Sequence, residues 1–174
     1  MTIDCVASSV GLDVELQNPY DYQDLPSLAQ LTQWANAAMQ NCDANGDHQG
    51  QIVKSLVVRV VNPTEGLQLN QDYRGKAYAT NILSFPFEAP PIELIDTLDI
   101  AEFSHLGDLV ICEPVLRKEA QQQNKTLLQH WAHLLVHGVL HLQGFDHISD
   151  AEAEIMESLE VKILEKLGFT NPYH

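Results

Sequence analysis

The chain has 174 residues, the length of one domain, and 45% of them are apolar, enough to bury a sizeable core. Nine Lys and Arg face 24 Asp and Glu, and the resulting net charge of −15 argues against broad electrostatic attraction to nucleic acid or anionic lipid. The 3 cysteines form no CxxC pair, which favours buried thiols in a reducing compartment over a disulfide framework.

Strand and helix patterns follow one another along the chain. In order, they predict a strand at residues 2–8, a helix at 27–41, a strand at 55–61, a helix at 64–72, strands at 82–87 and 109–111, and helices at 114–123, 127–142 and 150–167. Pro86 favours an edge position for the strand at 82–87. Because helices dominate the back of the chain without strict βαβ alternation, we predict one α+β domain over residues 1–174 with a small sheet.

Local signals set several boundaries. Either Asn62 or Thr64 can cap the helix at 64–72. Either Ser149 or Asp150 can cap the last helix, and Gly168 ends it. Between the elements, a turn is predicted at residues 45–47 and a surface loop at the proline-containing, acidic residues 88–104.

Targeting signals are missing from the amino-terminal sequence. It contains neither a basic region nor an apolar signal segment. No uninterrupted apolar run approaches the ~18 residues of a membrane span. We therefore expect a cytoplasmic protein without a membrane partner.

The most informative segment is HGVLHLQGFDH, residues 137–147. His137 and His141 are four residues apart, so on a helix they point from one face, as a shared metal ion requires. Gly144 can adopt a positive φ and end the helix, which lets His147 approach the same point. Three imidazoles leave one coordination position open for water, and this ligand set suits a single zinc ion.

Two further histidines precede this segment in the same predicted helix. The rise from His133 to His141 is ~12 Å, too long for one ion to bind both ends with bonds of ~2 Å. We therefore assign the metal to His137, His141 and His147. We interpret His130 and His133 as packing or hydrogen-bonding residues.

The spacing H-x3-H-x5-H is also that of metzincin proteases, so the central helix is predicted to present a metzincin-like site. Those proteases have a glutamate general base directly after the first histidine. Gly138 stands there in this chain, which argues against peptide hydrolysis. Met156, where a supporting methionine could be sought, lies in an amphipathic helical pattern and is interpreted as a core residue.

The histidine segment, together with YRGKAYATNILSF at residues 73–85, resembles the YbeY family of bacterial metal-dependent endoribonucleases. Gly107-Asp108 before a strand and the acidic last helix also match. The resemblance implies an α+β fold with a small mixed sheet packed against helices, and zinc held by His137, His141 and His147. It further implies cleavage of single-stranded RNA, in 16S ribosomal RNA 3′-end maturation and ribosome quality control, with the small ribosomal subunit as partner and no DNA substrate.

Arg74 corresponds to the arginine that the family places in its active-site cleft. Its planar guanidinium can hold two phosphate oxygens, so we expect it to act in catalysis; the alternative is a salt bridge with Asp72 or Glu88. The family usually has proline where this chain has Ala79, which leaves the backbone after Arg74 less restricted.

Other side chains near these motifs have weaker predicted roles. Lys76 and Arg59 are candidates for guiding the RNA backbone. Asp108 and Asp146 could orient histidines that hold the metal. Thr80 and Ser84 could donate hydrogen bonds either to RNA or to nearby backbone groups.

An alternative hypothesis is a non-catalytic ribosome assembly factor in which the zinc is structural. The two hypotheses differ in the effect of zinc removal, which would unfold the factor but leave an enzyme folded and inactive. The acidic composition also predicts weak binding of free RNA with a shallow salt dependence.

Overall fold

The computed structural model describes residues 11–40, 53–88 and 105–173. In chain order its elements are β1 (Gly11–Gln17), α1 (Leu28–Gln40), β2 (Val53–Val61), α2 (Pro63–Arg74), β3 (Ile82–Pro86), β4 (His105–Cys112), α3 (Glu113–Gln122), α4 (Leu127–Leu142) and α5 (Asp150–Lys166). The predicted helices and the predicted strands within these ranges are confirmed. The strand predicted at residues 2–8, the turn at 45–47 and most of the loop at 88–104 lie outside the described residues.

The described strands form one mixed sheet in the order β1-β2-β4-β3. β1 pairs with β2, and β2 with β4, in parallel, whereas β3 pairs antiparallel with β4. β3 is therefore an edge strand, as Pro86 predicts, because proline cannot donate to a neighbouring strand. The small mixed sheet expected from the family resemblance is confirmed.

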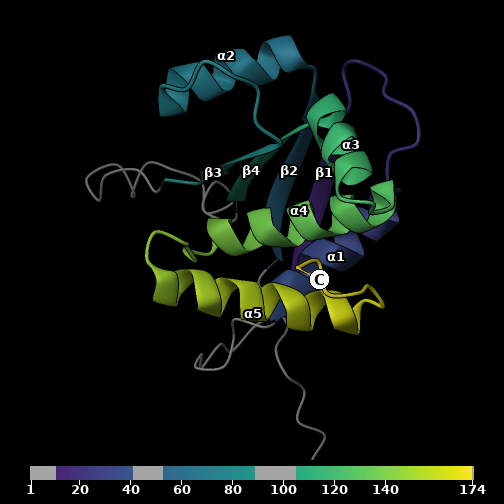
Figure 1. The fold of residues 1–174 in the computed structure, drawn as a ribbon, viewed down its shortest axis with the longest axis vertical. Helices are drawn as coiled ribbons and strands as arrows, with labels where there is room; N and C mark the ends of the chain where they lie inside the picture. The colour runs from purple at the N-terminus through teal and green to yellow at the C-terminus, as the bar shows by residue number, and fades with distance from the viewer. Residues whose placement is uncertain (1–10, 41–52, 89–104, 174) are drawn as a thin grey trace, which may run out of the picture.

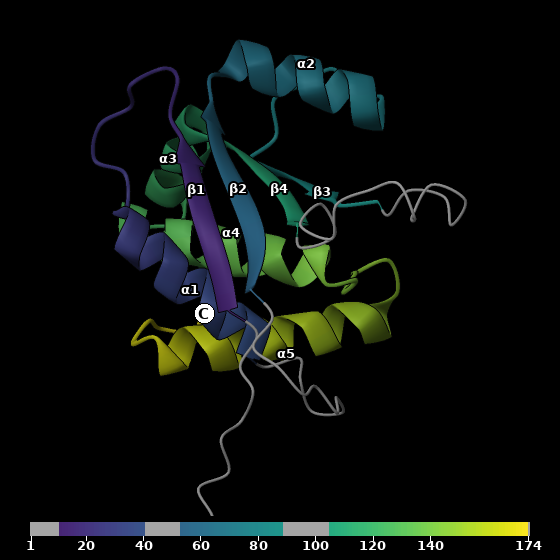
Figure 2. The ribbon, with the colours of Figure 1, turned by 180° about the vertical axis from the view of Figure 1, so that it is seen from behind.

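Helices α1, α4 and α5 lie together on one face of the sheet, with α4 across the strands and α5 beside it (Figure 1). The main core fills the space between them and includes Leu56, Leu109, Trp131, Leu135 and Leu140, all fully buried. Seen from behind, β1 and β2 have no described helix in front of them, and α2 lies across one end of the sheet (Figure 2). Burial of these large apolar side chains is the main stabilising term for the fold.

The caps explain where the helices begin. Thr126 and Gln129 form a reciprocal capping box at the start of α4, and Ser149 and Glu152 form another at α5. For α2 the side chain of Asn62 accepts a hydrogen bond from the backbone N–H of Glu65. Of the alternatives open from the sequence, the caps are thus Asn62 and Ser149.

One described strand was not predicted. β1 alternates the apolar residues Leu12, Val14 and Leu16 with charged ones, a period-two pattern typical of a strand with one buried face. Leu12 and Val14 are buried in the main core, and β1 packs against α1.

No helix in the described ranges is both long and apolar enough to span a membrane.

The packing of the sheet edge against the end of α4 can be tested at Gly107 on β4. A Cβ atom there would lie 2.5 Å from the backbone oxygen of Phe85 and 2.7 Å from Cδ2 of Leu142. We expect Gly107→Ala to lower the free energy of unfolding by about 1–3 kcal/mol, measured by urea denaturation. Gly11→Ala is the matched control, since its Cβ would meet no atom within 4 Å. Equal stability of the two variants would contradict this packing.

Candidate metal centre

Three histidines converge where α4 ends. His137 and His141 project from the last turns of the helix, with their Nε2 atoms 3.0 Å apart. Gly144 adopts a positive φ of 99°, and the chain turns so that His147 faces the other two. One nitrogen from each ring lies within 4.8 Å of the other two. The convergence predicted from the spacing is therefore confirmed.

The donor set fits a transition-metal ion. Tetrahedral zinc with bonds of about 2.0–2.1 Å would place its nitrogen ligands about 3.3 Å apart, close to the observed His137–His141 separation. Burial lowers the pKa of His141, and the neighbouring His137 and His147 lower it further. A lowered pKa favours the neutral imidazole, which is the form that binds a metal.

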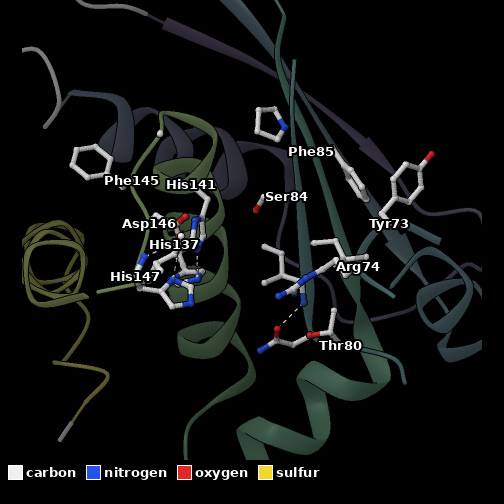
Figure 3. Close-up of a pocket in the computed structure, with 16 residues that line it drawn as sticks. Tyr73, Arg74, Thr80, Ser84, Phe85, His137, His141, Phe145, Asp146 and His147 are labelled. Atoms are coloured by element: carbon white, nitrogen blue, oxygen red, sulfur yellow. Dashed lines mark hydrogen bonds and ion pairs between the residues drawn. The ribbon is translucent and has the colours of Figure 1, made fainter. Parts of the chain in front are cut away.

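The histidines border an open pocket of about 870 Å³. His137 and His141 are partly buried, whereas His147 is exposed. In Figure 3 the three rings lie on one side of the pocket and Tyr73 and Arg74 on the other. The approach to the cluster is therefore open on the pocket side.

Arg74 is the last residue of α2, which ends because Gly75 adopts the left-handed conformation that favours glycine. Its side chain is exposed and lines the pocket with Thr80 and Ser84. Within the described residues it forms no ion pair, so the alternative considered for it, a salt bridge with Asp72 or Glu88, is absent there. A phosphate group in the pocket could therefore meet a free guanidinium.

The other basic candidates lie elsewhere. Arg59 binds Glu65 through Nε at 2.8 Å and also donates to Gln17. This ion pair gives it a structural role on β2, away from the pocket. Lys76 is exposed but is not among the residues that line the pocket. Ala79, where the family usually has proline, packs against the small apolar cluster of Val61, Leu83, Val110 and Cys112.

At Gly138, α4 packs closely against side chains of the sheet. A Cβ atom there would lie 2.7 Å from Cδ2 of Leu109 and 2.8 Å from Cδ1 of Ile82. A glutamate at this position would therefore point into packed apolar side chains. The structure gives a physical reason why the position that carries a general base in metzincin proteases is glycine in this chain.

The histidines earlier in α4 form hydrogen bonds, as predicted. Nε2 of His130 lies 2.9 Å from the Glu119 carboxylate, which also accepts from Asn81. Nε2 of His133 lies 3.1 Å from Oε2 of Glu160. Neither histidine belongs to the converging set.

Glu160, on α5, contacts His137, one of the three converging histidines. Its Oε1 is hydrogen-bonded to Nδ1 of His137, and its Oε2 accepts from the hydroxyl of Tyr173. Burial alone would raise the pKa of Glu160, but the hydrogen bonds from His133 and His137 outweigh it and lower the pKa to about 2. The carboxylate is therefore ionised at neutral pH.

Neither of the two aspartates proposed to orient these histidines forms a hydrogen bond with one of their rings. Asp108 is bound to His105 at 3.2 Å, so its predicted role is wrong. Asp146 accepts from the backbone N–H of His147 and lies 3.8 Å from Nδ1 of that ring.

Sequence reasoning missed Glu160, although its position in the last helix gives a signal. It occupies the buried stripe of α5 formed by Met156, Glu160, Ile163 and Leu164, where an acid is unusual. Met156 is a core residue, as predicted.

Comparisons with known proteins identify the family of this chain. The family model described as Endoribonuclease YbeY matches residues 16–168. A curated relative from Colwellia psychrerythraea strain 34H, named Endoribonuclease YbeY, is 47% identical over 160 residues, covering 92% of this chain and 96% of that protein. The solution structure of TM1509 from Thermotoga maritima matches with 19% identity and a TM-score of 0.49, over 90% of this chain and 91% of that one. On the sequence matches, this chain belongs to the YbeY family.

Proposed function

We propose that this protein is a zinc-dependent endoribonuclease that cleaves single-stranded RNA during ribosomal RNA maturation. The observation that supports it most is the placement, across one open pocket, of three converging imidazoles and the guanidinium of Arg74, which forms no ion pair with any described residue. Hydrolysis of a phosphodiester needs an activated water and a cation for the charge that develops on the phosphoryl oxygens. The relative from Colwellia, 47% identical, is named an endoribonuclease.

His137, His141 and His147 would hold the zinc. When bound, zinc supplies Lewis acidity toward water and toward a phosphoryl oxygen. The lowered pKa of His141 keeps its ring available as a neutral ligand at the pH of the cytoplasm. Three protein donors, rather than four, are typical of catalytic zinc, and His137, His141 and His147 border the open pocket from which water and RNA would approach.

Arg74 would contact the scissile phosphate. Its guanidinium stays charged at any cellular pH and can donate two parallel hydrogen bonds to phosphate oxygens. Thr80 and Ser84 line the pocket beside it and can donate hydroxyl hydrogens to the RNA backbone. No carboxylate follows His137, so peptide hydrolysis of the metzincin type has no general base at that position.

The partner that fits this chain is a ribosomal surface. With 24 acidic and nine basic side chains, the protein gains little from the charge of free RNA. An acidic surface is complementary to basic ribosomal proteins, which would deliver the single strand to the pocket. We therefore propose the small ribosomal subunit as partner, with action at the 3′ end of 16S RNA and in ribosome quality control.

Metal removal separates an enzyme from an assembly factor with structural zinc. The core of Leu56, Leu109, Trp131 and Leu135 is apolar and does not include the converging histidines. We therefore expect the chelator-treated protein to keep its far-ultraviolet circular dichroism while losing RNA cleavage, and to recover cleavage when zinc is added back. Loss of folded structure on chelation would instead favour the assembly factor.

Removing the guanidinium tests the phosphate contact. We expect Arg74→Ala to reduce single-turnover cleavage of single-stranded RNA by about 10²–10³-fold while leaving zinc content unchanged, because one charge-stabilising donor is lost. Arg117→Ala is the control: Arg117 is ion-paired with Glu113 on α3 and does not line the pocket. A residual activity within a few-fold of the unmodified protein would rule out a catalytic role for Arg74. His141→Ala must also abolish cleavage, which excludes a contaminating nuclease.

The salt dependence of binding reports how many phosphates are contacted. Arg74 is the one Lys or Arg among the described residues that line the pocket. We therefore expect the logarithm of the association constant for single-stranded RNA to fall against the logarithm of salt concentration with a slope of about −1. Fluorescence anisotropy with a labelled oligonucleotide measures it. A slope steeper than about −4 would indicate an extended cationic surface that this account does not contain.

A further inference from the structure

Glu160 is a fully buried carboxylate at the back of the candidate metal centre. It projects from α5 toward α4, and none of its surface reaches solvent. Both of its oxygens are occupied. Oε1 is bound to Nδ1 of His137, while Oε2 is bound to Nε2 of His133 and to the hydroxyl of Tyr173.

The hydrogen bond to His137 determines which nitrogen of that ring carries the proton. The carboxylate oxygens of Glu160 serve as acceptors, Oε2 from the hydroxyl of Tyr173 and Oε1 from His137, so Nδ1 of His137 is the donor. The lone pair of the neutral ring is then on Nε2, the atom that faces His141 and the pocket. The pair thus holds the ring both in the tautomer and in the orientation that a metal ligand requires.

The surroundings hold the carboxylate itself in place. Burial raises the pKa of the Tyr173 phenol, and Glu160 raises it further, so Tyr173 keeps its proton and donates it. Tyr173 comes from the C-terminal segment, His133 and His137 from α4, and Glu160 from α5. Three parts of the chain therefore meet at the carboxylate of Glu160. Its hydrogen bonds to His133 and Tyr173 restrain the carboxylate, and the carboxylate in turn restrains the ring of His137.

A packing role alone gives a poor account of this residue. Its neighbours on the buried stripe of α5 are Met156, Ile163 and Leu164, and an apolar residue would complete that stripe without the cost of desolvating a charge. The charge has a clear use if the opposite edge of the His137 ring binds a cation. The carboxylate then increases the basicity of the ring and partly balances the charge of the ion.

We propose that Glu160 is a positioning residue that sets the metal affinity of the site by holding His137 as an Nδ1–H tautomer. This inference rests on the proposed function, because it requires that His137, His141 and His147 bind a metal. It assigns no contact with RNA to Glu160.

The experiment compares zinc affinity in Glu160→Gln and in the unmodified protein, by competition with a chromophoric chelator. We expect the variant to bind zinc about 10–100-fold more weakly. The visible absorption of the Co²⁺-loaded protein is a second readout, and we expect its bands to shift or weaken because the His137 ring is no longer held. Neither readout depends on RNA cleavage.

Glu119→Gln is the matched control. Glu119 also accepts from a buried histidine of α4, His130, but that histidine lies outside the converging set. We expect the control to keep the zinc affinity and the Co²⁺ spectrum of the unmodified protein. Equal zinc affinity in Glu160→Gln and the unmodified protein, or an equal loss in both variants, would overturn the inference. If the unmodified protein binds no transition metal, the proposed function falls as well.

Tyr173→Phe decides the case if Glu160→Gln does not fold. It removes one donor to Oε2 but leaves both the carboxylate and His137 in place. We expect a smaller loss of zinc affinity, about threefold, with thermal unfolding of the metal-free protein little changed. An unchanged zinc affinity in this folded variant would count against the proposed role.

Discussion

The packing of α4 against the sheet is the constraint on which the site depends. This helix contributes Trp131, Leu135 and Leu140 to the core, and its last turns also carry His137 and His141. At Gly138 it lies so close to Leu109 and Ile82 that a Cβ atom would come within 2.8 Å of both side chains, which would have to shift. Core formation and the placement of the imidazoles therefore have one cause: the fold that buries the apolar face of α4 also brings its C-terminal end to the edge strand β3.

The two sides of the pocket are held by different means. The histidine side rests on α4, the turn at Gly144 and a buried carboxylate on α5. The arginine side rests on the end of α2, where Gly75 stops the helix and leaves Arg74 exposed. A rigid ligand side with a solvent-accessible cation opposite suits a reaction in which the substrate is an extended, charged chain.

Sequence reasoning succeeded where one local pattern was sufficient. Helical spacing and capping residues predicted α4 and α5, and the i, i+4 pair with Gly144 predicted how His137, His141 and His147 converge. It failed where the partner is distant in the chain. Asp108 was a candidate to orient one of these histidines, but it binds His105. The carboxylate that contacts His137 belongs to Glu160, 23 residues further along the chain. Only the packing of α5 on α4 brings that pair together.

The account depends most on the coordination of the ion itself. X-ray absorption spectroscopy at the zinc edge of the purified protein, without an affinity tag, measures it directly. We predict one zinc per chain, with three imidazole nitrogens and one oxygen ligand from water, all at about 2.0–2.1 Å. A protein purified without any transition metal, or a shell that contains sulfur or fewer than three imidazoles, would contradict the account.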